Sequence, residues 1–295
     1  MMLVLIENLS TFQNIIYIIS SMLFITGIKM LGKEDTAVRG NFLSALAMFI
    51  AVSITFVNVV NPLIIIIGIS VGAIIGSVIA LKVKMTSIPE MVALFNGFGG
   101  LATFFIAWSE FSTTPENYFQ YILIMLTTFI GGVTFTGSII AYGKLSERLQ
   151  IKKTSLITKL FTTIFYISLI YLIYSTFFTG IFEPNFDFYL ILIILTLLGG
   201  IGFVLPIGGG DMPVVISLLN SFSGIAAAFA GLMLSNNVLI VAGSLVGASG
   251  LILTIIMAKA MNRSIGNILF VGYASSSSGS KTGETGEVKP INVSD

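Results

Sequence analysis

The side chains that could do chemistry are few, and their types limit that chemistry. The 295 residues include no Cys and no His. A chain without thiols and imidazoles has no disulfide, no thiolate or imidazole metal ligand and no nucleophile activated by histidine. The polar groups that remain within its apolar stretches are mainly amides and hydroxyls. An amide donates and accepts hydrogen bonds and so orients water, but it does not take up a proton near neutral pH.

Two of these amides, Asn96 and Asn220, occupy equivalent positions of an internal repeat. Segment 87–102 resembles segment 211–226 at an offset of 124 residues. The same offset aligns Pro89 with Pro213, Phe98 with Phe222 and Gly100 with Gly224. An amide in hydrocarbon is costly unless it is hydrogen-bonded. Each is therefore either a hydrogen-bonding contact between helices or part of a functional path, and their recurrence favours function.

Three further residues are candidates because of their setting. Glu90 and Asp211 are the acids nearest the starts of the two repeated stretches. A favourable charge at a helix N-terminus explains Glu90 without a function, whereas Asp211 follows three glycines in a loop, which favours a functional role. Ser138 lies within the Gly- and Thr-rich segment 131–138. Serines in spans commonly bond their own helix backbone, but these small neighbours leave room for water.

The elements that must position these residues are membrane spans. Apolar residues make up 56% of the chain and charged residues 9%, against about 25% charged in soluble domains. A soluble globular enzyme and a disordered chain are therefore excluded. A span needs about 20 apolar residues. Nine stretches qualify: 11–31, 41–60, 63–82, 88–108, 118–142, 156–179, 186–206, 212–234 and 237–261.

The predicted fold is an all-α polytopic membrane helix bundle with nine transmembrane helices and a parallel internal repeat, because the repeated stretches lie four spans apart. This domain covers residues 1–273, and residues 274–295 read as a flexible, Ser/Gly-rich cytoplasmic linker. Glycine ridges on the third and ninth stretches predict close helix approach. They comprise Gly68, Gly72 and Gly76, and Gly243 and Gly247.

The positions of the charges set the expected orientation. All 14 Lys and Arg residues fall in the odd-numbered connections and at the C-terminal end. The outer segments hold only acids, such as Glu7 and Glu110. Cytoplasmic loops concentrate Lys and Arg. We therefore expect the N-terminus outside and the C-terminus in the cytoplasm.

Five segments resemble the beta subunit of proton-translocating NAD(P) transhydrogenase. They are 85–93, 133–138, 209–215, 219–221 and 260–264. The Asp-Met-Pro-Val-Val block that starts at Asp211 and the Met-Asn-Arg-Ser block that starts at Met261 are specific in combination. By this resemblance, the positions linked to proton passage or coupling are Asn220, Ser138, Asp211, Gly250 and Arg263.

The resemblance also implies an activity and partners. It implies that this chain is a membrane proton channel, coupled to hydride transfer from NADH to NADP+ on soluble domains elsewhere. No cofactor or metal is expected on this chain, since NADP(H) and NAD(H) belong to partner domains. The expected partners are the alpha subunit, the NADP(H)-binding domain and the lipid bilayer, in a dimeric complex of the bacterial inner membrane. No nucleic acid is expected.

The sequence departs from the family pattern at two places. Many members carry a His at the position of Asn96, and the NADP(H) domain is expected where this sequence stops, as in a truncated chain or a split gene. Three explanations of the missing His stay open: water held by Asn96, Asn220 and Ser138 with Glu90 titrating, a group supplied by a partner, or impaired pumping. Two other functions also stay open, a small-solute secondary transporter and a passive membrane anchor.

Overall fold

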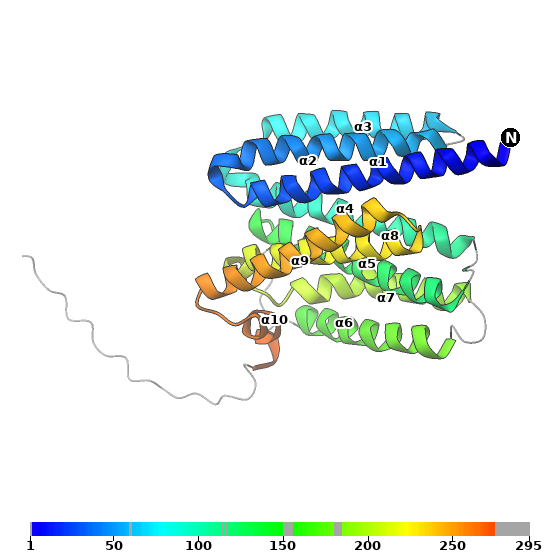
Figure 1. Cartoon of the computed structure of the whole chain (residues 1–295). Coiled ribbons are helices and arrows are strands. Elements are labelled where there is room, and N and C mark those ends of the chain that lie inside the picture. The colour runs from blue at the N-terminus through cyan, green and yellow to red at the C-terminus, as the bar shows by residue number, and fades with distance from the viewer. Residues whose placement is uncertain are drawn as a thin grey trace, which may run out of the picture.

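The structure is that of a membrane helix bundle. The computed structural model describes residues 2–58, 61–113, 115, 117–149, 156–179 and 185–274. Nine helices in that part of the chain are long and apolar enough to cross a membrane. They are α1 (Met2–Leu31), α2 (Glu34–Thr55), α3 (Pro62–Lys82), α4 (Ile88–Ser112), α5 (Tyr118–Leu145), α6 (Leu156–Tyr174), α7 (Phe186–Val204), α8 (Met212–Met233) and α9 (Asn237–Ala260). They lie side by side (Figure 1), which confirms the predicted all-α polytopic bundle of a multi-pass membrane protein.

Several boundaries differ from those expected. Helix α2 begins at Glu34 rather than at residue 41, and the acids Glu34 and Asp35 in its first turn favour that earlier start. A further helix, α10 (Ile265–Ala274), follows α9. It is too short to cross a bilayer, and Ile268 packs in a buried cluster with Met212 of α8 and Ala258 of α9. Beyond Ala274, the predicted linker lies outside the described residues.

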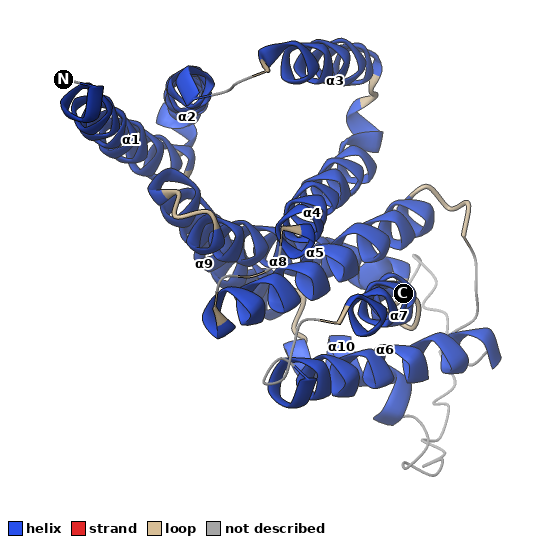
Figure 2. Ribbon diagram, turned by 90° about the vertical axis from the view of Figure 1, so that its right-hand side faces the viewer, coloured by secondary structure: helices blue, strands red, loops and turns tan. Residues whose placement is uncertain are grey.

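Helices α5 and α8 form the centre of the bundle. Each buries 67% of its most apolar 18-residue segment, the largest share among the described spans. Figure 2 shows α4, α7 and α9 arranged around these two helices, and α6 beyond α7. Glycines permit the close approach, since a Cβ on Gly100 of α4 would lie 2.8 Å from the Gly131 carbonyl oxygen of α5.

The internal repeat is visible in the backbone. A 3-10 turn at Met85–Ser87 leads into α4, and an equivalent turn at Gly209–Asp211 leads into α8, at the offset of 124 residues found in the sequence. A proline stands in the first turn of each helix, where its missing N–H removes no helical hydrogen bond. Helix α4 then packs on α5 as α8 packs on α9. The parallel repeat is therefore confirmed.

Helix α3 stands apart from the rest of the bundle. None of its residues is buried, and Figure 2 shows its ribbon set apart from those of α5, α8 and α9. Its predicted glycine ridge has no neighbour within 4 Å of any added Cβ, among the residues described. On α9, by contrast, a Cβ on Gly243 would clash with the backbone nitrogen of Ala228 on α8. The ridge on α9 therefore packs as expected, and the ridge on α3 does not pack within this chain.

Candidate functional site

Asn96 lies where three helices meet. Its side-chain amide is half-buried and bridges α5 and α8. The Nδ2 group of Asn96 donates to Ser138 Oγ at 3.0 Å. The hydroxyl of Ser223 donates to Asn96 Oδ1 at 2.8 Å. The structure thus brings together the predicted residues Asn96 and Ser138, and it adds Ser223, which sequence reasoning missed.

Small residues make this convergence possible. A Cβ on Gly97 would lie 3.0 Å from the Cβ of Ser138, so α4 and α5 touch at the level of the site. Ser138 is fully buried there. A Cβ on Gly99 would lie 4.0 Å from Ser223 Oγ, so glycine on α4 also faces α8. The Asn96 amide is therefore hydrogen-bonded through both its nitrogen and its oxygen, as polar groups within a protein interior usually are.

Asn220 is placed differently from its repeat equivalent. It is exposed on α8, and it makes no hydrogen bond with any other described residue. One turn along the same helix, Ser223 faces α4 and contacts Asn96. The two related helices therefore share an interface, but only Asn96 lies in it. Asn220 faces away from this chain's own interior.

A second polar cluster lies where α8 begins and α9 ends. Asp211, in the turn before α8, accepts a hydrogen bond from Arg263 at 3.1 Å in an ion pair. Asp211 is 7% exposed, while the Arg263 side chain is half-exposed. Asn262 ends α9 in a left-handed conformation with φ of 53°, and the amide of Arg263 donates to the Ala258 carbonyl. This helix-terminating turn directs Arg263 back toward α8.

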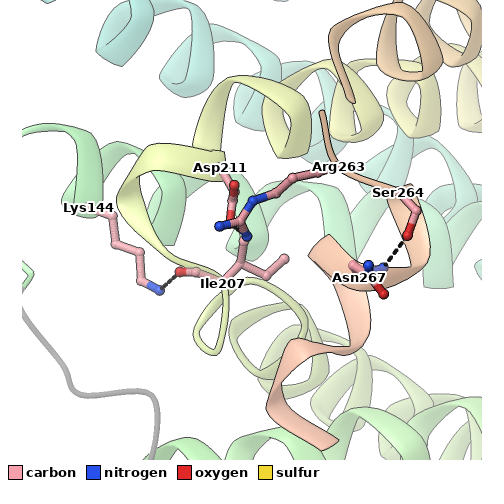
Figure 3. A network of polar contacts seen from close by, with 6 residues as sticks. All are labelled: Lys144, Ile207, Asp211, Arg263, Ser264 and Asn267. Atoms are coloured by element: carbon pink, nitrogen blue, oxygen red, sulfur yellow. Dashed lines mark hydrogen bonds and ion pairs between the residues drawn. The ribbon is translucent and has the colours of Figure 1, made fainter. Parts of the chain in front are cut away.

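Lys144 lies at the same end of the bundle, and sequence reasoning missed it as well. Its ammonium donates to the carbonyls of Val204 at 3.2 Å, Leu205 at 2.5 Å and Ile207 at 2.5 Å. Figure 3 shows this lysine on one side of the turn that leads to Asp211. A cation at the C-terminal end of a helix satisfies carbonyls that have no partner in the helix. Lys144 therefore ties the end of α5 to the end of α7.

The remaining candidates lie apart from both clusters. Gly250 is buried where α9 crosses α8, and its Cβ would lie 2.9 Å from the Cα of Ser221. Glu90 is half-buried in the first turn of α4 and has no hydrogen bond or ion pair with another described residue. It precedes Asn96 by six residues, about 9 Å along the helix. Among the described residues, no three carboxylates gather in a way that would hold a metal ion.

Comparison with known proteins places this chain in a family. A sequence model of the NAD(P) transhydrogenase beta subunit matches residues 13–295. Two similar proteins are both named NAD(P) transhydrogenase subunit beta, one from Rhodospirillum rubrum and one from a specified strain of that species. Each is 36% identical over 271 residues, which cover 88% of this chain and 58% of the relative. The chain thus spans little more than half the length of these relatives, and it belongs to the NAD(P) transhydrogenase beta subunit family.

Proposed function

We propose that this chain forms the proton-conducting membrane domain of a proton-translocating NAD(P) transhydrogenase. The hydride transfer from NADH to NADP+ takes place on soluble domains that lie outside the described residues or on other subunits. The observation that carries the proposal is the Asn96–Ser138 hydrogen bond in the packed centre of a nine-span chain of this family. Family membership does not favour a solute transporter or a passive anchor.

The amide and hydroxyls around Asn96 supply the donors and acceptors that water needs within hydrocarbon. They do not themselves titrate near neutral pH, so the path requires an ionisable group from elsewhere. Glu90 lies about 9 Å of helix rise from Asn96 and is not bonded to it. This separation favours the explanation that a partner subunit supplies the group.

The exposed amide of Asn220 supports a partner on that side of α8. An amide left in hydrocarbon without a hydrogen bond costs roughly 2 to 7 kcal/mol. We expect a membrane helix of the alpha subunit to cover Asn220 and to offer it a polar side chain. The path then runs between that helix and the repeat-related helices α4 and α8, in one protomer of a dimer.

The cluster of Asp211, Arg263 and Lys144 suits a coupling role. The ion pair between Asp211 and Arg263 joins the start of α8 to the end of α9, next to where the NADP(H)-binding domain is expected. Coupling requires contacts that differ between two states of the nucleotide domain. A domain that engages or releases this pair would shift the helices that carry Asn96 and Asn220. The Lys and Arg bias supports a cytoplasmic position for this end, and we propose that the chain lies in the inner membrane of a bacterial cell.

The test is reconstitution in vesicles with the alpha subunit and the NADP(H)-binding domain. We expect Asn220→Ala to lower proton uptake, and Asp211→Asn to lower both proton uptake and coupled hydride transfer. Ser249→Ala is the matched control, because Ser249 is exposed on α9 and bonds only its own helix at Val246. If Asn220→Ala and Asp211→Asn both behave like this control, the site assignment is wrong.

A further inference from the structure

Ser223 donates its hydroxyl to a side chain of another helix, unlike several other serines of the described spans. Ser53, Ser112 and Ser249 each donate to a carbonyl three or four residues back in their own helix. This is the usual arrangement for a serine in a membrane helix. The hydroxyl of Ser223 instead reaches from α8 to the side chain of Asn96 on α4, 127 residues away in sequence. A second contact, to the Asn96 main-chain carbonyl, is longer at 3.4 Å.

This contact determines how the Asn96 amide faces its neighbours. The oxygen and nitrogen of an amide have nearly the same shape, and rotation about the last torsion of asparagine is broad and roughly two-fold. The amide orientation is therefore set by hydrogen-bond partners and not by steric fit. With Ser223 donating to Oδ1, Nδ2 is left to donate to Ser138. A directed chain of donors thus runs from α8 through α4 to α5.

We propose that Ser223 is a positioning residue of the proton path, which holds the Asn96 amide with its nitrogen toward Ser138. The inference rests on the proposed function, because it concerns the same site. The charged groups of the three helices on this side are Glu90, Lys144 and Asp211, all near the inner ends. None of them is bonded to the amide, so the orientation depends on the two hydroxyls. Without Ser223, Asn96 samples both orientations and the path is interrupted for part of the time.

The experiment uses the complete complex in vesicles and measures proton-coupled hydride transfer. We expect Ser223→Ala to lower the rate about fivefold, the effect of one net hydrogen bond. The KM values for the nucleotides should not change, because the nucleotide sites lie outside this membrane domain. Ser223→Thr should restore the rate, since it keeps the hydroxyl.

A double-mutant cycle separates positioning from simple packing. Asn96→Ala alone should lower the coupled rate, and Ser223→Ala should then add no further loss. Ser221 is the matched control, because this buried serine of α8 donates to the Gly247 carbonyl on α9 at 2.6 Å and not to Asn96. Ser221→Ala should lower thermal stability, and any effect on rate should be the same with and without Asn96.

The outcomes distinguish this inference from the function on which it rests. If Asn96→Ala lowers proton uptake while Ser223→Ala leaves the rate unchanged, or lowers it equally in both backgrounds, the positioning role is wrong and the proposed function stands. Failure of Ser223→Thr to restore the rate in a folded complex also contradicts the positioning role. If Asn96→Ala leaves coupling intact, both the path through Asn96 and the role of Ser223 are overturned.

Discussion

Two hydroxyl groups, those of Ser138 and Ser223, satisfy the amide of Asn96 within the apolar centre of the bundle. Asn220 has the same residue type at the equivalent repeat position, yet it faces outward with no such partners. The difference comes from packing. Helix α4 turns Asn96 toward both α5 and α8, whereas Asn220 lies on an exposed face of α8. Equivalent positions in a repeat therefore make different contacts when the neighbouring helices differ.

This contrast predicts opposite effects of one substitution at the two amides. Asn96→Leu should lower the stability of the isolated chain by about 1 to 3 kcal/mol, because it leaves the buried Ser138 and the half-buried Ser223 without a partner. Asn220→Leu should leave stability unchanged or raise it, since it removes an unpaired amide from an apolar surface. Thermal unfolding in detergent measures both. Equal losses at the two positions would mean that Asn220 is paired within this chain.

At the scale of helices, the bundle is held together unevenly. Glycines bring α4 onto α5 and α8 onto α9 at backbone contact, whereas α3 has no buried residue. Close approach of backbones strengthens van der Waals packing, which is a main source of association between helices in lipid. The pairs that carry the candidate residues are therefore held together at backbone contact.

Replacement of glycine by alanine should affect stability in opposite directions at the two glycine ridges. Gly243→Ala places a methyl group against the α8 backbone near Ala228, and backbone does not move aside cheaply, so we expect a loss of about 1 to 3 kcal/mol. Gly72→Ala meets nothing within 4 Å and should stabilise α3 by up to about 1 kcal/mol through helix propensity. Unfolding of the isolated chain tests both. Comparable destabilisation by the two variants would contradict the separate position of α3.

The contact between Lys144 and the end of α7 makes a further prediction. Lys144→Met should leave the carbonyls of Leu205 and Ile207 without their cation, at a cost of about 1 to 2 kcal/mol. Hydrogen exchange should increase in the turn from residue 204 to Asp211, while exchange in α1 stays unchanged. Lys144→Arg keeps the charge and should preserve protection. Unchanged exchange in Lys144→Met would show that the lysine does not hold this turn.

At the scale of the whole molecule, hydropathy alone was enough to predict the nine spans, because crossing a membrane is a local requirement on each stretch. The repeat could also be predicted from the sequence, since Pro89 and Pro213 stand at equivalent helix starts. Ser223 and Lys144 were not predicted, because helices that are apolar all round carry no periodicity to show which face packs against which neighbour. The outward position of Asn220 depends on the same missing information.

The most direct test of the account measures proton uptake by the complete complex in sealed vesicles during hydride transfer, with a pH-sensitive dye. The account predicts that Asn96→Leu abolishes uptake, because leucine offers water no hydrogen bond. Asn96→His should retain it, since imidazole also donates and accepts, and should add a dependence on pH between 5 and 8. Proton uptake at the unsubstituted rate in Asn96→Leu, in a folded complex, would contradict the account.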